Sequence, residues 1–411
     1  MDNIISKKLS NGLKLVIIKL PGSQAVTSTA YIRAGYRFDP LVRPGLSHFS
    51  EHMIFHGSEK YPSKDALAKV IHQNGGSHYA FTWIDFQKHT VRMPLANYIQ
   101  GLDALLNTLF KPIIRQEDLD SERGVILEEI KNNRSDPTKA LWDYVSNPLF
   151  FQGTKLSRPY SGVEKDVEKI TLSNIRRFIE SYFKLANTTL FIAGNVDANK
   201  IEKLVNSYNS IEIDKKTDKH RIIKPIFRKK NLYIKDPNYY QSTVIVGVPV
   251  GKYTSKDRYA LDILRNILGN YYGSPILRQL QGKKGLVYSW QTFIDYYRGG
   301  GNFLFSASCA KENSSLVKEI IKNEFKKLGE GSISKDEIDI AKGYAIGSLQ
   351  AGLESGYDII EWYGLQEIEG TDTFTTIDET NNIYKKISPG EINKVALKFF
   401  KSESILAGHI G

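Results

Sequence analysis

The sequence predicts an α+β protein made of two homologous domains, each a mainly antiparallel sheet covered by helices. Three observations support this fold class. The chain has 411 residues, which is too long for one ordinary core. It contains an internal repeat, and its strand patterns come in groups between long helical patterns. Its composition, 41% hydrophobic and 25% charged, is typical of a soluble globular protein.

The repeat consists of an amphipathic helix followed by a short apolar strand. One copy begins at Lys169 and reads KITLSNIRRFIESYFK, and the other begins at Lys386 and reads KISPGEINKVALKFFK. Both strands then end in Ala-Gly, and Ser388 with Glu391 three residues later forms a capping box at the start of the second helix. We therefore expect duplicated halves, although a chance similarity between two amphipathic helices would look the same.

The expected domains are an N-terminal one at 1–212 and a C-terminal one at 229–411, joined by a basic linker at 213–228. The stretch DKKTDKHRIIKPIFRKK, at 214–230, concentrates positive charge and has no clear periodicity. The net charge of +11 could instead indicate a nucleic-acid partner. However, this stretch lacks the interleaved aromatic residues of a single-strand binder, so we expect no nucleic acid.

Strands and helices within each half follow from hydrophobic periodicity and β-branched content. Helical spacing occurs at 95–110 and 334–355. Apolar and β-branched runs predict strands at 12–20, 28–36, 86–95, 242–250 and 301–309.

The expected location is the cytoplasm, with no membrane association. No apolar run approaches the roughly 18 residues of a membrane helix, and the start of the chain lacks the pattern of a signal peptide. The single cysteine, Cys309, excludes an internal disulfide and a thiolate zinc cage. Any metal must therefore be held by nitrogen and oxygen.

The run GLSHFSEHMIFHG contains the main candidate site. Pro44 and Gly45 before the histidines and Gly57 after them predict a helix from about 44 to 56 with Gly57 as the C-terminal cap. On that helix, His48 and His52 lie about 40° apart on one face, with Glu51 alongside. Two imidazoles one turn apart can chelate zinc, and an adjacent carboxylate can accept a proton from a water molecule. The pattern H-x-x-E-H is the reverse of H-E-x-x-H.

A catalytic zinc ion requires a third protein ligand. The candidate lies in LDSERGVILEEIKNNRSDP, a helical stretch in which Glu122 and Glu129 are seven residues apart and nearly on one face. Glu128 points about 100° away from Glu129. His56 is the main rival, because it extends the histidine ladder by four residues, but it has drifted about 80° around the helix from His48.

Ordinary hydrogen-bonded histidines remain the alternative interpretation of the motif. Six of the eight histidines fall between His48 and His89, whereas the second half contains only His409 beyond the linker. If the halves are duplicates, only the first kept the metal chemistry.

The sequence resembles the inverzincin peptidases, which include pitrilysin, insulysin and the mitochondrial processing peptidases. The resemblance covers nearly the whole chain, through NGLKLVI, IRAGYRFDPLVRPGLSHFSEHMIFHGSEKYP, GGSHYAFTWID, ERGVILEEI, LFIAGNVD and GKKGLVYS. The length resembles that of the short two-domain bacterial branch, in which two chains close like a clamshell around a peptide chamber.

The resemblance implies a zinc-dependent endopeptidase that hydrolyses unfolded peptides inside a closed chamber, with one Zn²⁺ per chain. By the resemblance, His48, His52 and Glu129 would be the zinc ligands. Glu51 would be the general base, and Glu122 would be the acidic residue that supports the ligands.

The resemblance also implies substrate-binding residues. An extended peptide would pair with the strand edge at Ala80, Phe81 and Thr82, where this chain has Tyr79 at a position that is commonly asparagine in the family. Tyr288 would donate to the oxyanion, although an ordinary buried tyrosine is the alternative.

The second half departs from the family at one position. The family usually has an arginine seven residues before the tyrosine, and this chain has Gln281 there. Arg278, one turn earlier, could substitute for the missing arginine. The partner would be a second copy of the chain or a related subunit.

Two other functional classes remain open. One is a noncatalytic or partner-dependent subunit of a heterodimeric peptidase, although such chains typically lose zinc ligands. The other is a structural zinc protein or a nucleic-acid-binding protein. Glu51 argues against a structural site, because such a site does not require a free carboxylate beside the metal.

Overall fold

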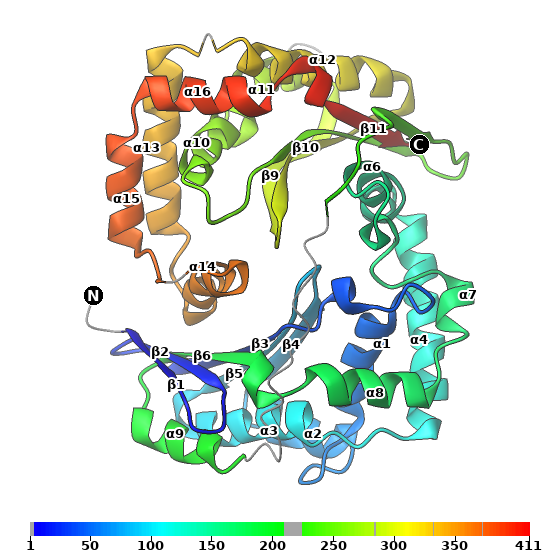
Figure 1. The fold of residues 1–411 in the computed structure, drawn as a ribbon, viewed down its shortest axis with the longest axis vertical. Coiled ribbons are helices and arrows are strands. Elements are labelled where there is room, and N and C mark those ends of the chain that lie inside the picture. The colour runs from blue at the N-terminus through cyan, green and yellow to red at the C-terminus, as the bar shows by residue number, and fades with distance from the viewer. Residues whose placement is uncertain (1–3, 209–223, 283–284, 332, 372) are drawn as a thin grey trace. The chain divides into compact units, whose positions relative to one another are not determined.

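The computed structural model describes residues 4–208, 224–282, 285–331, 333–371 and 373–411 (Figure 1). The chain divides into two compact units. The first consists of residues 1–130, 160–221 and 353–368, and the second of residues 131–159, 222–352 and 369–411. Each unit contains one sheet and its own helices, so the α+β prediction is confirmed.

The first unit contains a six-stranded sheet in the order β1-β2-β6-β3-β5-β4. β2 and β6 are parallel, and the other neighbouring pairs are antiparallel. β4 lies at one edge and pairs with β5. The bounds of the strands are β1 Ile4–Lys8, β2 Lys14–Lys19, β3 Ala25–Ile32, β4 Ser77–Thr82, β5 Gln87–Pro94 and β6 Thr188–Gly194.

Helices cover this sheet on both faces. Leu15 and Ile17 of β2 and Ile192 of β6 belong to the apolar core that the helices from the first half build. The opposite face carries polar residues, and there α14 (Gly356–Glu369) is held by bonds from Tyr31 and Lys88 to Glu361, 2.9 and 2.7 Å long. The other helices are α1 Leu46–Met53, α2 Lys64–Ile71, α3 Tyr98–Phe110, α4 Gln116–Ser135, α7 Glu164–Val167, α8 Leu172–Tyr182 and α9 Ala198–Asn206.

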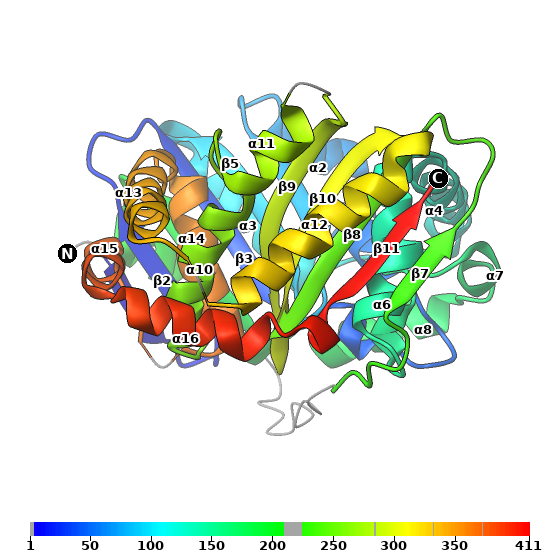
Figure 2. The same ribbon diagram turned by 90° about the horizontal axis from the view of Figure 1, so that it is seen from above.

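The second unit contains a five-stranded sheet in the order β7-β11-β8-β10-β9. Figure 2 shows α12 lying over these strands. The strands are β7 Asn231–Ile234, β8 Gln241–Val250, β9 Val287–Tyr297, β10 Gly300–Ala310 and β11 Leu406–Ile410. The helices are α5 Pro137–Ala140, α6 Asn147–Phe150, α10 Asp257–Gly269, α11 Pro275–Gln281, α12 Ser314–Gly329, α13 Lys335–Ala351, α15 Ile377–Lys386 and α16 Pro389–Phe399, and the π-helical turn Leu141–Ser146 joins α5 to α6.

The strand order of the first sheet recurs in the second. β6 lies between the parallel strand β2 and the antiparallel strand β3. In the same way, β11 lies between the parallel strand β7 and the antiparallel strand β8. The helices before them, α8 and α16, each begin with a capping box, at Thr171 and Ser388. The two copies of the sequence repeat therefore have the same structure and the same place in their sheets.

The compact units are not the contiguous halves expected from the repeat. Residues 131–159 group with the second unit, and residues 353–368, which include most of α14, group with the first. Most of the expected linker, at 213–223, lies outside the described residues. Within the described part of the chain, every helix is too short or too polar to cross a membrane.

Candidate metal centre

The helix that carries the histidine motif, α1, has Gly45 as its N-terminal cap. Gly45 has a positive φ of +84°, and a Cβ there would lie 2.2 Å from the carbonyl oxygen of Ser161. Asp39 accepts hydrogen bonds from the backbone N–H groups of Gly45 and Ser47, both 2.8 Å long, and so satisfies donors of the first turn. Glycine is thus required at the start of α1 for both conformation and space.

The helix ends differently from the prediction. α1 ends at Met53, and the turn Ile54–His56 is a 3₁₀ helix that closes at Gly57, which has a φ of 145°. The tighter winding of the last turn changes the direction of His56 relative to an ideal α-helix. His56 faces α4, where it contacts the carboxylates of Asp118 and Glu122.

Three predicted residues meet between α1 and α4. One ligand atom from each of His48, His52 and Glu129 lies within 4.8 Å of the others. Glu129 Oε2 is 3.7 Å from His48 Nε2 and 3.6 Å from His52 Nε2. Among the described residues, this is the group of His, Cys, Asp and Glu side chains that could hold a metal ion.

The spacing of these atoms fits a tetrahedral ion. Ligand atoms about 2.0 to 2.1 Å from Zn²⁺ lie roughly 3.4 Å apart at tetrahedral angles. In contrast, Glu122 bonds directly to His52 at 3.0 Å and to His56 at 2.7 Å, which leaves no space for an ion between those groups. His48, His52 and Glu129 therefore fit the predicted metal, whereas His56 fits a hydrogen-bonding role.

Neighbouring side chains orient the three candidate ligands. Glu122 accepts a hydrogen bond from His52 Nδ1, so Nε2 is the ring nitrogen that faces the centre of the group. Tyr160 donates to Glu129 Oε1 at 3.0 Å, and its ring lies edge-on to His48 with centroids 5.0 Å apart. Oε2 of Glu129 therefore remains the oxygen that faces both histidines.

The charges of the group follow from burial and pairing. Burial lowers the pKa of His48 to about 4, with a further contribution from the charge of His52, so its imidazole is neutral at pH 7. Burial also lowers the pKa of His52, but bonds to Glu122 and Glu129 outweigh it and raise the pKa to about 9. For Glu129, burial raises the pKa, yet the histidines and Tyr160 bring it down to about 2.

Glu51 stands beside this group. Its side chain is 9% exposed, and the hydroxyl of Thr82 donates to its Oε2. Burial raises the pKa of Glu51 to about 7 against the opposing effects of Thr82 and His52. A carboxyl group with a pKa near neutrality can both accept and release a proton at physiological pH.

The predicted substrate strand is β4, at the edge of the first sheet. Tyr79 and Phe81 are exposed, 55% and 46%, on one face of β4. Ala80 lies on the opposite face, as does Thr82, whose hydroxyl is bonded to Glu51. Phe81 also stacks on Trp83, with centroids 5.6 Å apart.

The remaining predicted residues belong to the second unit. Tyr288 is 65% exposed near the start of β9. Arg278 and Gln281 lie on α11, where Arg278 is exposed and the side-chain oxygen of Gln281 is buried without a hydrogen-bond partner among the described residues. Their roles stay predictions.

Sequence reasoning missed two contributors to the site. Tyr160 follows Glu129 by 31 residues, and no local pattern marks it. Asp118 accepts a hydrogen bond from His56 and lies four residues before Glu122 on α4. The i, i+4 spacing of Asp118 and Glu122 is the signal that could have identified Asp118.

The family follows from comparison with known proteins. A family model described as insulinase (peptidase family M16) matches residues 14–170, and a second, described as the peptidase M16 inactive domain, matches residues 169–343. The chain belongs to the M16 peptidase family. The first match contains the histidine motif and Glu129.

Relatives of this M16 chain match it over nearly their whole length. An uncharacterized zinc protease of Streptomyces coelicolor is 26% identical over 394 residues, which cover 94% of this chain and 85% of the relative. An uncharacterized zinc protease of Bacillus subtilis is 24% identical over 399 residues, 97% and 96% of the two chains. The chain is therefore similar to short members of the family.

Solved structures show the same fold. A protease from Helicobacter pylori matches with a TM-score of 0.87 at 20% identity and covers 99% of both chains. The periplasmic protease PqqL from Escherichia coli matches with a TM-score of 0.81 at 17% identity, covering 100% of this chain and 48% of that one.

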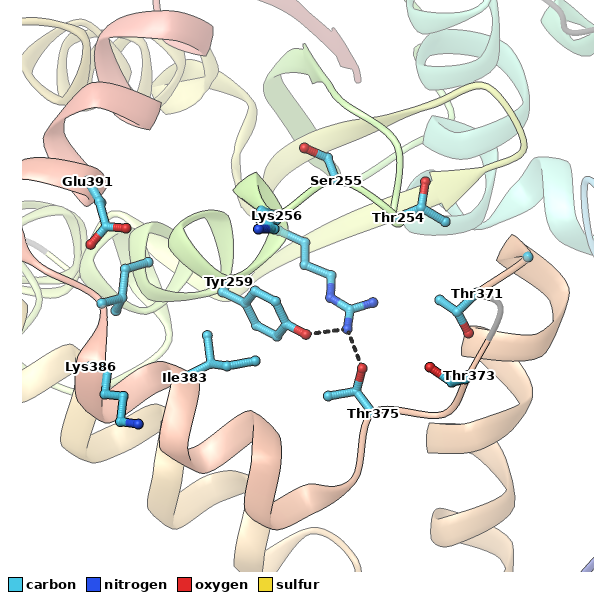
Figure 3. A pocket seen from close by; sticks show the side chains of 13 residues that line it. Thr254, Ser255, Lys256, Tyr259, Thr371, Thr373, Thr375, Ile383, Lys386 and Glu391 are labelled. Carbon is cyan, nitrogen blue, oxygen red and sulfur yellow. Dashed lines mark hydrogen bonds between the residues drawn. The ribbon is translucent and has the colours of Figure 1, made fainter.

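The second unit of this M16 chain contains a cavity of about 880 Å³ that includes none of the predicted site residues. Figure 3 shows Thr371, Thr373 and Thr375 along one side of it. The guanidinium of Arg258 lies 4.3 and 4.5 Å from the ring centroids of Tyr253 and Tyr259, and it donates to the hydroxyl of Thr375 at 3.3 Å. These contacts give Arg258 a role in packing.

Proposed function

We propose that this chain is a zinc-dependent endopeptidase that hydrolyses unfolded peptides. The observation that carries the proposal is the position of Glu51. It is a buried carboxyl group beside three potential ligands whose donor atoms lie within 4.8 Å of one another, and it is not itself one of them. A structural metal site does not require such a group, whereas peptide hydrolysis does.

His48, His52 and Glu129 would hold the ion through Nε2, Nε2 and Oε2. Zinc bound there would supply a Lewis acid that acidifies a water molecule and polarises the peptide carbonyl. Glu122 orients His52 so that Nε2 faces the other two ligands, where binding of an ion would displace the Nε2 proton, and Tyr160 holds Glu129 so that Oε2 faces the histidines. These hydrogen bonds reduce the reorganisation that metal binding would otherwise require.

Glu51 would move the proton. Thr82 donates to its Oε2, which leaves Oε1 to accept a proton from the attacking water. The same carboxyl group would then give the proton to the leaving amine. Since a divalent cation stabilises a nearby carboxylate, bound zinc would lower the pKa of Glu51 below its metal-free value of about 7.

The substrate would bind as an added strand on the edge of β4. Among the described strands, β4 pairs on one side with β5, so its other side can bond to an extended peptide. Backbone bonding of this kind selects unfolded chains and gives loose sequence specificity. The exposed rings of Tyr79 and Phe81 would contact substrate side chains.

The test combines metal analysis with peptide cleavage. The purified chain should contain about one zinc ion, and His48→Ala and Glu129→Ala should lose it. Glu51→Gln should keep zinc while cleavage falls by orders of magnitude. Glu128→Ala is the matched control, because Glu128 is the exposed neighbour of Glu129 on α4, and it should keep both zinc and activity. Full activity of Glu51→Gln would contradict the proposal.

A second candidate function is a subunit that cleaves peptides only with a different partner chain. Gln281 favours it, because glutamine stands where the family usually has an arginine, and a donor to the reacting carbonyl typically contributes about 100-fold or more in rate. Arg278 and Tyr288 would be the remaining donors of the second unit. The other arrangement is a homodimer in which Gln281, an uncharged donor, contacts the reacting carbonyl less strongly than an arginine would.

Cleavage of a mixed peptide library by the isolated chain separates these arrangements. A gain in rate for Gln281→Arg together with a loss for Tyr288→Phe would support a homodimer in which Gln281 is a weak donor to the reacting carbonyl. Absence of activity in every variant, with zinc bound, would support the partner-dependent subunit. Full activity that is indifferent to both substitutions would remove these residues from the mechanism. The cytoplasmic location stays a prediction.

A further inference from the structure

The candidate metal centre is part of a longer ladder of histidines and carboxylates. α1 and its 3₁₀ extension carry His48, His52 and His56, and the facing side of α4 carries Glu129, Glu122 and Asp118 in the reverse order. Glu129 lies between His48 and His52, Glu122 between His52 and His56, and Asp118 beyond His56. The last members of this ladder have no role in the function proposed above.

Both ring nitrogens of His56 are engaged. Nε2 donates to Glu122 Oε1 at 2.7 Å, and Nδ1 lies 3.1 Å from Asp118 Oδ1. Asp118 is itself held by Arg115, whose Nη1 is 3.4 Å from Oδ2 and whose Nη2 donates to the carbonyl of Pro62 at 2.8 Å. With both nitrogens bonded, His56 cannot also serve as a metal ligand.

The bond from His56 controls the direction of Glu122. One oxygen of Glu122 accepts from His56 and the other accepts from His52, so the carboxylate plane is fixed by two bonds on opposite sides. Glu122 is 5% exposed, and Lys64 also lies near it, with Nζ 3.7 Å from Oε1 on a side chain that is 69% exposed. An exposed lysine with four rotatable bonds orients a carboxylate less firmly than the His56 imidazole, whose side chain is 11% exposed.

We infer that His56, held by Asp118, is a positioning residue that fixes Glu122 and thereby orients the zinc ligand His52. The inference rests on the proposed function, since it concerns the same metal site. Groups that hydrogen-bond to ligands typically contribute 10- to 100-fold to metal affinity. His56 acts one bond further away, so we expect His56→Ala to weaken zinc binding by about 10-fold, the lower end of that range.

The test measures zinc affinity by competition with a chromophoric chelator, and the visible spectrum of the cobalt-substituted protein. His56→Ala should lose about 10-fold in affinity and shift the cobalt bands. His56→Gln keeps an N–H donor for Glu122 and should recover most of the loss. Asp118→Ala should show a smaller loss. His72→Ala, which removes an exposed histidine outside the ladder, is the matched control and should bind zinc as the wild type does.

The outcomes separate this inference from the proposed function. If Glu129→Ala keeps zinc, the ligand set and the proposed function are wrong. If Glu129→Ala loses zinc while His56→Ala and Asp118→Ala bind as the wild type does, only the positioning role is overturned. Complete loss of zinc in both His56→Ala and His56→Gln, as in His48→Ala, would make His56 a ligand and also overturn it. Should His56→Ala fail to fold, His56→Gln and Asp118→Ala decide.

Discussion

The contribution of one buried histidine to the stability of the protein should be lost on mild acidification. His89 lies on β5 with no exposed surface, and its ring packs near Phe55 and Phe183, with centroids 5.7 and 6.1 Å away. Its Nε2 donates to the side-chain oxygen of Gln87 at 3.1 Å, whereas Nδ1 has no hydrogen-bond partner among the described residues. Protonation would therefore bury a charge and an unpaired donor.

The size of the effect follows from the shift in pKa. Burial, with a smaller contribution from His78, lowers the pKa of His89 from 6.5 to about 3. The unfolded chain binds this proton more readily, so the stabilising contribution is fully present above pH 6.5 and is lost progressively as the pH falls towards 3. Between pH 7 and pH 5, the free energy of unfolding should fall by about 2 kcal/mol from this residue.

Urea denaturation at pH 7, 6 and 5 would measure the loss, with EDTA present so that zinc release does not contribute. His89→Phe keeps an aromatic ring and removes the titrating group, although Gln87 loses a hydrogen bond and the variant should be less stable at pH 7. Its free energy of unfolding should fall by about 2 kcal/mol less than that of the wild type over this range. An equal pH dependence in the two proteins would refute the reasoning.

Two further predictions concern packing and the ligands. A Cβ at Gly364 on α14 would lie 2.4 Å from the ring of Tyr31, so Gly364→Ala should lower the free energy of unfolding by about 1 to 3 kcal/mol. Gly343 on α13 has no atom within 4 Å of such a Cβ, and Gly343→Ala should instead raise it by about 0.5 to 1 kcal/mol; thermal denaturation of both variants measures the difference. Tyr160→Phe removes the bond to Glu129 Oε1 and should weaken zinc binding about 10-fold, with the fold retained, as chelator competition would measure.

Local sequence patterns were sufficient to predict the relative positions of candidate residues that share a helix. The spacing of His48 and His52 places them one turn apart whatever surrounds them, and Glu122 and Glu129 share a face of α4 for the same reason. The five strands predicted from apolar content also form, as β2, β3, β5, β8 and β10. The repeat predicted two matching sheets, since a duplicated sequence carries the same helix start and the same buried strand.

Contacts between elements could be found only in the tertiary structure. No sequence pattern indicates that Thr82 donates to Glu51, that Tyr160 holds Glu129, or that α14 packs on the first sheet although it lies in the second half of the chain. Nor does a sequence pattern indicate that His56 lies in a 3₁₀ turn and bonds to Glu122 on α4. The physical reason is range: helical periodicity is a property of consecutive residues, whereas these contacts join residues 31 or more positions apart, and only the packing of the core brings them together.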